Sequence, residues 1–447
     1  MGRITLASLV KKNYQLGDVR FSASSRFNGQ QELQFGDSLT SRIDLKAAGI
    51  SYMVKSGGLT TEVVKAFGLG RLKNIRQLTY GFWPPISENQ SPKMVRTFPH
   101  TRYDHVLDAM ALMALMINNN RGLFTQTEVN TGLIAALTHD LFTPAGGDAI
   151  KHVDMKGLDE DTNFGDLLSK ADFNLRPLIE KCGLSVELLV KTVEGKGVLG
   201  RLLDLADKQA YCARDLAYFV EWQRQSQNKS DIIWQLAWHS VKQPSIAGIW
   251  DIIKVVGADV VATDAERMAD FVQLRAMLWA NLYVSPGTKF FEDFFAEIIW
   301  QYLYDEGKLT RHQLMQWGDS DLQNMLDGAL GQIGASTDIN FLGGPPRVKT
   351  FVDAKKADAF EMELNKNENI FVLRKDDKKR PVIKPETHYK VQTATGIFSL
   401  KEALPERAEE IYHIADIDPI RVYWVENPVM SQTLRIMYDA YKKRIKK

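Results

Sequence analysis

Hydrophobic residues recur at three- and four-residue spacing through most of residues 52–335, and this pattern predicts a largely helical body. The clearest stretches are residues 104–118, 127–140, 200–222, 268–284, 290–307 and 309–330, the last predicting two short helices. We expect Asp104 and Thr127 to cap the first two helices, because such side chains accept hydrogen bonds from free N–H groups at a helix start.

The pattern changes after a Gly-Gly-Pro-Pro segment at residues 343–346. Short β-rich runs at 369–375, 387–394 and 421–425 then alternate with helical stretches. The predicted fold class is therefore mainly α, with a smaller α+β C-terminal portion. We predict an N-terminal arm over residues 1–50, a helical core over 51–342 and an α+β C-terminal subdomain over 343–447.

Composition narrows the class of protein. Hydrophobic residues make up 45% of the 447 residues, which excludes a wholly disordered chain. The net charge of +1 provides no global attraction for nucleic acid or anionic lipid. Two cysteines are too few for a disulfide framework, and no segment approaches the roughly 20 apolar residues that span a bilayer. We expect a cytoplasmic protein without membrane contact.

Histidine and aspartate residues on separate predicted helices form a candidate metal site. His139 and Asp140 are adjacent at the end of one apolar helix, His105 lies on the preceding helix, and Asp207 lies on a later one. Such a dipeptide alone is common by chance, but three helices could bring all four side chains to one cation. Nitrogen and oxygen ligands are compatible with Mn, Fe, Mg, Zn or Ni, and the ligand types do not identify which metal binds.

Five stretches of the chain, taken in order, resemble the HD-domain phosphohydrolases and, within them, the deoxynucleoside triphosphate triphosphohydrolases. They are residues 70–84, 98–110, 135–140, 206–215 and 271–283. The resemblance covers roughly residues 52–335 and implies a helical HD-domain core. It assigns the metal ligands to the four residues already obtained from spacing, His105, His139, Asp140 and Asp207.

The resemblance also assigns residues that contact phosphate. Arg102 precedes the first histidine ligand by three residues, Lys208 follows Asp207 directly, and Arg275 lies on a later helix. A planar guanidinium binds phosphate oxygens in a bidentate manner. By resemblance, the three cations would offset charge on the phosphates, and Arg102 would do so at the reacting centre.

A third implied group surrounds the sugar. Tyr211 and Asp215 follow Asp207 at four-residue steps, so the three share one helix face. By resemblance, Tyr211 would meet the sugar face, Asp215 and Gln77 the 3′-hydroxyl, and Tyr283 the sugar and base. Leu78 would crowd the 2′ position and disfavour ribose. Taken singly, each of these residues also fits an ordinary core or surface role.

The sequence departs from the family where histidines usually supply a proton. Thr143 and Asp148 stand at those two positions, and His152 lies four residues further on. One hypothesis is that Asp148 or His152 is the general acid, with Asp148 orienting His152. The other is that the site binds nucleotide but turns it over poorly.

The function that the resemblance implies is hydrolysis of deoxynucleoside triphosphates to deoxynucleoside and triphosphate, assisted by a divalent metal ion. Alternatives are hydrolysis of nucleoside mono- or diphosphates, and a nucleotide sensor with weak catalysis. A purely structural helical scaffold would leave the metal set unexplained. The family implies a homo-oligomer. Basic runs at 374–384 and 442–447 are candidates for binding a nucleotide or single-stranded nucleic acid.

Overall fold

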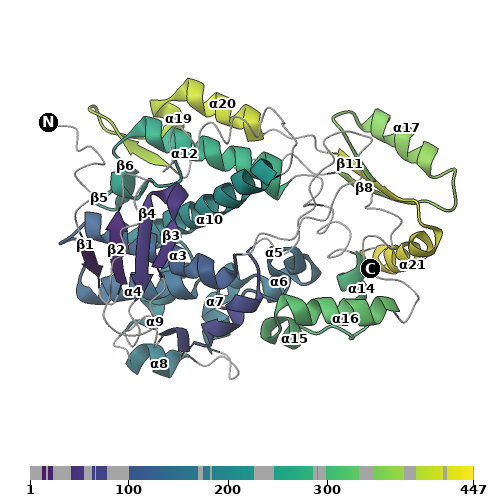
Figure 1. Ribbon diagram of the computed structural model, residues 1–447, viewed down its shortest axis with the longest axis horizontal. Helices are drawn as coiled ribbons and strands as arrows, with labels where there is room; N and C mark the ends of the chain where they lie inside the picture. Colours follow the sequence, from purple (N-terminus) through teal and green to yellow (C-terminus); the bar gives the residue numbers. More distant parts are fainter. Residues whose placement is uncertain are drawn as a thin grey trace.

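The structure is a computed structural model of the chain (Figure 1). The residues that it describes are 13–16, 19–23, 42–54, 63–65, 67–77, 100–169, 175–181, 184–225, 246–284, 289, 298–331, 347–376, 389–415 and 420–445.

Three long helices pack against one another at the centre of the molecule, and they are α3 (Arg102–Asn119), α4 (Gln126–Thr138) and α10 (Gly197–Gln225). Helix α3 is buried without interruption from His105 to Asn118, which is why its apolar residues are not confined to one face. Gly132 of α4 allows a close approach to α3, because a β-carbon there would lie 2.9 Å from the Met113 side chain.

A buried polar cluster ties α3 to α10. Asp108 accepts hydrogen bonds from Tyr52 Oη at 2.6 Å and from Arg214 Nε at 2.5 Å. Arg214 Nη2 donates to the same carboxylate at 3.0 Å, so the arginine binds both oxygens. The two helices that this cluster joins also carry His105 and Asp207.

An N-terminal sheet has the strand order β1-β2-β4-β3 and is antiparallel throughout. Its strands are β1 (Asn13–Leu16), β2 (Val19–Ala23), β3 (Arg42–Leu45) and β4 (Ile50–Val54). Tyr52 brings this sheet to the central helices through its hydrogen bond to Asp108.

A second sheet joins two distant parts of the sequence, in the order β10-β9-β6-β5. Its strands are β5 (Ile253–Val256), β6 (Asp259–Ala262), β9 (Lys390–Gln392) and β10 (Ile397–Ser399). Strands β6 and β9 are parallel, and the other two pairs are antiparallel. The sheet contacts helices α12 (Ala265–Leu278) and α19 (Leu400–Ala403), and α20 (Pro405–Ala415) packs on α12. A C-terminal segment therefore covers part of the helical core.

A third sheet lies at the right of Figure 1, with the antiparallel order β7-β11-β8. It consists of β7 (Arg347–Phe351), β8 (Phe371–Asp376) and β11 (Ile420–Val425), with helices α17 (Ala354–Leu364) and α21 (Pro428–Ile445). Ala357, Ile420 and Val422 form a small apolar cluster of their own beneath α17.

Shorter helices complete the described part of the chain. The α-helices are α5 (Gly147–Ile150), α6 (Met155–Leu158), α7 (Glu160–Ser169), α8 (Arg176–Lys181), α9 (Val186–Val193), α14 (Gln301–Asp305), α15 (Arg311–Gln316) and α16 (Asp319–Gly331). The 3-10 helices are η1 (Lys46–Ala48), η2 (Leu69–Asn74), η3 (Lys151–Val153) and η5 (Trp250–Ile252), and η6 (Trp279–Tyr283) is a π-helix.

The mainly α fold with a smaller α+β portion is confirmed. Both predicted caps were wrong. Thr101 caps α3 and Thr125 caps α4, because Asp104 and Glu128 act as the third residues of capping boxes. The boundaries expected near residues 50 and 343 stay predictions, and residues 332–346 lie outside the described ones. Among the described helices, none is both long and apolar enough to cross a membrane.

Candidate metal centre

The first histidine of the centre is held at the start of α3. Thr101 Oγ1 accepts a hydrogen bond from the backbone N–H of Asp104, and Asp104 Oδ2 accepts one from the backbone N–H of Thr101 at 2.8 Å. This reciprocal cap fixes where the helix begins. His105 therefore projects from a defined first turn, and its side chain is buried.

The second histidine lies where α4 ends. His139 is the C-cap residue and Asp140 follows it. The Nδ1 atom of His139 lies 2.8 Å from the carbonyl oxygen of Ala136. A carbonyl oxygen only accepts, so Nδ1 carries a proton, and Nε2 is the ring nitrogen that faces His105. This orientation by a backbone carbonyl is common for metal-binding histidines.

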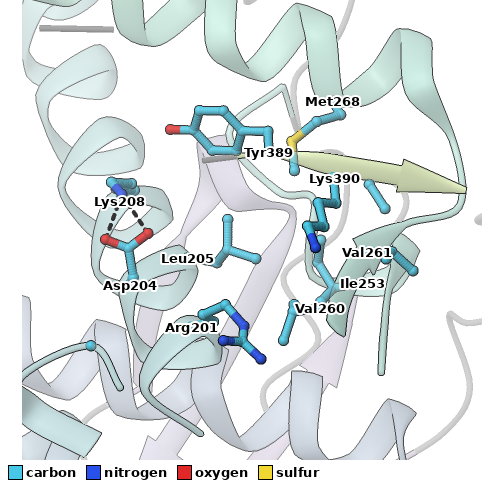
Figure 2. Close-up of a pocket in the computed structure, with 12 residues that line it drawn as sticks. Arg201, Asp204, Leu205, Lys208, Ile253, Val260, Val261, Met268, Tyr389 and Lys390 are labelled. Carbon is cyan, nitrogen blue, oxygen red and sulfur yellow. Dashed lines mark hydrogen bonds and ion pairs between the residues drawn. The ribbon is translucent and has the colours of Figure 1, made fainter. Parts of the chain in front are cut away.

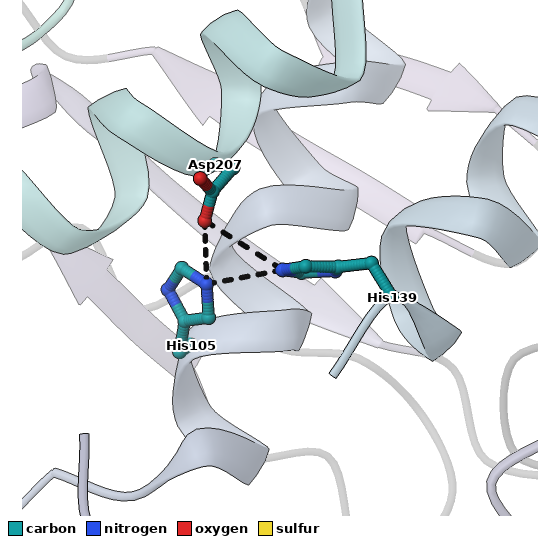
Figure 3. A group of neighbouring side chains, drawn as sticks. All are labelled: His105, His139 and Asp207. Carbon is teal, nitrogen blue, oxygen red and sulfur yellow. Dashed lines mark hydrogen bonds and ion pairs between the residues drawn. The ribbon is translucent and has the colours of Figure 1, made fainter. Parts of the chain in front are cut away.

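Three side chains from three helices converge on one point (Figure 3). His105 Nε2 lies 2.9 Å from Asp207 Oδ1 and 3.2 Å from His139 Nε2. His139 Nε2 lies 3.6 Å from the same Asp207 oxygen. Ligands about 2.0–2.2 Å from one ion have separations of this order, so the donor atoms fit a cation among them.

The fourth predicted ligand lies at the edge of this group. The Asp140 carboxylate oxygens are each 3.8 Å from a histidine Nε2, Oδ2 from His105 and Oδ1 from His139. Asp140 Oδ2 also accepts a hydrogen bond from Arg102 Nη1 at 3.0 Å. The structure thus brings all four predicted ligands together, with Asp140 shared between the centre and an arginine.

The charges of the centre favour a cation. Burial alone would lower the pKa of His139, but the carboxylates of Asp140 and Asp207 outweigh it and raise the pKa to about 9. Burial likewise opposes ionisation of Asp207, yet hydrogen bonds from His105 and His139 hold its pKa well below the usual range. The two acids therefore concentrate negative charge where a divalent ion would bind.

A chain of ion pairs leads away from Asp140, from the buried Arg102 to the exposed carboxylate of Asp148 and on to Lys151. Arg102 Nη2 donates to Asp148 Oδ2 at 2.7 Å, and Lys151 Nζ lies 2.8 Å from both Asp148 Oδ1 and Glu160 Oε2. Glu160 is buried and accepts a hydrogen bond from the Thr143 hydroxyl at 3.1 Å. The two positions that hold histidine in the resembled family thus belong to a charged network that fixes Arg102.

The residues considered as proton donors differ in their surroundings. The Asp148 carboxylate is exposed, and the neighbouring cations Lys151 and Arg102 lower its pKa, so it is charged at neutral pH. Helix α5 begins at Gly147, and His152 follows it in η3, where its side chain is exposed. That Asp148 orients His152 stays a prediction.

The predicted phosphate contact Arg275 is held by hydroxyl groups. Arg275 Nε donates to Tyr211 Oη at 2.6 Å, and Nη1 donates to Tyr389 Oη at 2.9 Å. No acidic side chain pairs with Arg275 within the described part of the chain. Within the described residues, its positive charge is therefore held by hydroxyl groups and not by a carboxylate.

The predicted sugar residues also meet. Tyr283 Oη donates to Asp215 Oδ2 at 2.5 Å, and the rings of Tyr283 and Tyr211 lie edge to face, 5.9 Å apart. His100 Nε2 lies 3.4 Å from Asp215 Oδ1 but is not aligned for a hydrogen bond. Burial raises the pKa of Asp215 to about 7, although Tyr283 and Arg102 act in the opposite direction.

Buried polar atoms without a hydrogen-bond partner occur on Asp215, on its neighbour His100 and on Gln77. Among the described residues, Gln77 Oε1, both ring nitrogens of His100 and Asp215 Oδ1 are buried without a hydrogen-bond partner. Gln77 is connected to His100 by its backbone N–H, which lies 3.3 Å from the His100 carbonyl oxygen. Buried polar atoms normally have partners, so this group could receive a hydroxyl of a bound molecule.

Other predicted residues are placed less directly. Lys208 is paired with Asp204 on the same helix. Leu78 lies outside the described residues, as do residues 377–384 of the first basic run and 446–447 of the second. Arg374, which begins the first run, is paired with Asp358 and Asp376.

Four residues of this region were missed from the sequence: His100 beside Asp215, Lys151 and Glu160 behind Arg102, and Tyr389 beside Arg275. Lys151 and Glu160 resemble ordinary helix-surface charges in the sequence, and Tyr389 lies more than 100 positions from Arg275. For His100, its closeness to His105 in the sequence was a usable signal.

Comparison with known proteins supports the fold. The sequence matches no model of a known protein family and no curated protein. A solved structure of a hypothetical protein from Aquifex aeolicus has a TM-score of 0.58 at 15% identity, covering 90% of this chain and 100% of that one. A phosphohydrolase from Bacteroides thetaiotaomicron has a TM-score of 0.57 at 15% identity, covering 87% and 100%. The chain therefore shares the fold of a phosphohydrolase.

Proposed function

We propose that the protein is a metal-dependent phosphohydrolase of the HD type that acts on deoxynucleoside triphosphates. The observation that carries the proposal is the convergence of His105, His139 and Asp207, with Asp140 at the edge, on one cation-sized point. The shared fold with a phosphohydrolase supports the reaction class. The substrate class rests on the surrounding residues and on the sequence resemblance.

The four ligands would hold one divalent ion, which supplies Lewis-acid activation of a phosphate oxygen and of water. The chain's own cations then bind the phosphates. Arg102 is fixed on one side by Asp140 and on the other by Asp148, so its guanidinium is oriented before substrate arrives. Arg275, held by two tyrosine hydroxyls, provides a second cation.

A sugar hydroxyl would be bound by the unsatisfied group at Asp215. Asp215 Oδ1 and Gln77 Oε1 accept hydrogen bonds, and a hydroxyl can donate one of them. Tyr211 and Tyr283 border the same place and would pack against the sugar ring. The proposed exclusion of a 2′-hydroxyl rests on Leu78.

Proton donation to the leaving oxygen is the step at which this chain differs most from the resembled family. Asp148 is held ionised by Lys151 and Arg102, and this favours a role in orienting Arg102 over proton donation. We therefore assign proton donation to His152, which lies four residues after Asp148 in the sequence.

Product analysis tests the reaction. Protein loaded with Mn or Mg is incubated with each of the four deoxynucleoside triphosphates, and products are separated by chromatography. Release of inorganic triphosphate with deoxynucleoside supports the proposal, whereas release of orthophosphate alone would reject it. His139→Ala and Asp207→Ala should abolish turnover, and His312→Ala, an exposed histidine on α15, is the matched control.

A second candidate is a nucleotide sensor that binds without useful turnover. Thr143 and Asp148 stand where the resembled family has histidines, and both take part in the network around Glu160 and Arg102. This replacement favours the sensor. Tight binding of a deoxynucleoside triphosphate by metal-loaded protein, with no product after long incubation, would establish the sensor and end the hydrolase proposal. We further propose that the protein is a homo-oligomer, which sedimentation would test.

A further inference from the structure

A pocket lies between α10 and the sheet formed by β5, β6 and β9 (Figure 2). Its volume is about 250 Å³. Apolar side chains form its floor, among them Leu205, Val260 and Met268, and Tyr389 closes one end. Strand β9 brings Tyr389 and Lys390 to the pocket from a C-terminal segment of the chain.

The pocket carries a positive charge. Its lining contains the cations Arg201, Lys208 and Lys390 and one acid, Asp204. Lys208 is paired with Asp204, and Lys390 Nζ lies 2.7 Å from Asp259 Oδ1. Three cations from two elements therefore line one pocket with an apolar floor, and of these Lys208 is mostly buried while Arg201 and Lys390 are exposed. This lining favours an anion with several charges.

The pocket adjoins the proposed substrate site through two links. Lys208 follows Asp207 directly on α10, so neighbouring faces of one helix serve the metal centre and the pocket. Tyr389 lies in the pocket lining and accepts a hydrogen bond from Arg275, which also contacts Tyr211. Lys208 is therefore common to the two sites, because it is next to the proposed ligand Asp207 in the sequence and part of the pocket lining.

We infer that this pocket binds polyphosphate, and that Arg201 and Lys390 bind the outer phosphates of the substrate while the phosphate that reacts lies at the metal centre. The inference rests on the proposed function and goes beyond it, because it explains selection of triphosphates over monophosphates. Phosphate oxygens would replace Asp204 and Asp259 as partners of the lysines, with the charge-assisted hydrogen bonds that such pairs form. The C-terminal segment thereby takes part in substrate selection.

Binding of inorganic triphosphate tests the pocket without any need for turnover. Isothermal titration calorimetry of chelator-treated full-length protein should give a Kd that rises by about tenfold in Arg201→Gln and again in Lys390→Gln. Raising the salt concentration should weaken binding in the wild type more than in the double variant. Lys191→Gln and Arg176→Gln remove exposed cations on α9 and α8 and should leave the Kd unchanged. Equal Kd values for the wild type and the double variant would overturn the inference.

Kinetics then separate two sources of the polyphosphate. Competitive inhibition of nucleotide turnover by inorganic triphosphate identifies the substrate's own outer phosphates, and the double variant should raise KM for triphosphates with little change for monophosphates. Non-competitive action would identify a separate polyphosphate ligand in the same pocket. His139→Ala, which removes a proposed metal ligand, should keep triphosphate binding. Binding that depends on Arg201 and Lys390 in a protein that hydrolyses no nucleotide would uphold the pocket and reject the proposed function.

Discussion

Arg275 donates a hydrogen bond from Nη1 to the hydroxyl oxygen of Tyr389 at 2.9 Å, across 114 positions of the sequence. The arginine belongs to α12, and the tyrosine immediately precedes β9. Because β9 pairs with β6, which directly precedes α12, the sheet holds Tyr389 close to Arg275. The orientation of a proposed phosphate-binding residue therefore depends on a segment far from the predicted motifs.

Tyr389→Phe should weaken this arrangement while keeping the buried ring in place. Removing one hydrogen bond to a charged group should lower the free energy of unfolding by about 1–2 kcal/mol. The KM for nucleotide should rise, because Arg275 loses one of two hydroxyl groups that orient it. Urea unfolding and steady-state kinetics measure the two effects.

Tyr412→Phe is the matched control for Tyr389→Phe. Lys401 Nζ lies 5.4 Å from the centre of the Tyr412 ring, and this cation–π contact does not need the hydroxyl. Its stability and KM should equal those of the wild type. A Tyr389→Phe protein that matches the wild type in both measurements would show that Tyr211 alone orients Arg275.

The predicted ligands could be found from the sequence because the spacing of residues along a helix determines which face each side chain occupies. His139 and Asp140 are adjacent, and Asp207 begins a series of residues at four-residue steps, so three predicted helices could bring the ligands to one point, and the family resemblance assigned the same set. The mainly α fold followed from the same periodicity. The caps were misassigned by two or three residues, since Thr101 and Asp104 both suit a helix start and only the backbone decides between them.

Contacts between segments that are distant in the sequence could not be predicted from helical spacing. Lys151 reaches Asp148 one turn away, but its second partner, Glu160, lies on another helix. The parallel pairing of β9 with β6 positions Tyr389, and no local sequence pattern predicts that pairing. The pocket lined by Arg201 and Lys390 has the same origin, because its two walls come from distant segments.

The buried pair of Asp108 and Arg214 should be important for stability. Asp108 is fully buried and binds Arg214 through both oxygens, so Arg214→Met would leave an uncompensated carboxylate. Breaking a buried ion pair in this way costs roughly 3–5 kcal/mol. Urea unfolding should show that loss, and Arg176→Met, at an exposed pair on α8, should change stability by less than about 1 kcal/mol. A small effect at Arg214 would mean that Tyr52 alone satisfies Asp108.

Asp215 should make stability depend on pH. Burial raises its pKa from 3.8 to about 7, so between these values the folded protein binds more protons than the unfolded chain. Stability from this group is therefore greatest at low pH and falls as pH rises from about 4 to about 7, by about 1.4 kcal/mol per unit of pKa difference. The groups that face it are His100, Tyr283 and Arg102, and burial lowers the pKa of His100 to about 3.

Comparison with Asp215→Asn isolates this effect. The difference in free energy of unfolding between the wild type and the variant, measured in urea from pH 4 to pH 8, should move steadily against the wild type up to about pH 7 and then level off. A difference that stays constant across this range would show that the Asp215 carboxyl has an ordinary pKa in the folded protein.

The proton donor is decided by two variants of the metal-loaded enzyme. Asp148→Asn should lower kcat/KM about 10- to 100-fold, because Arg102 loses a charged partner, while the shape of the pH–rate profile is kept. His152→Ala should lower kcat by roughly 100-fold or more and remove the decline of the rate at high pH, since a general acid must be protonated to act. His312→Ala, at an exposed position, should change neither quantity. Full activity of His152→Ala would reject histidine as the donor and leave Asp148, despite its charged network, as the group to test next.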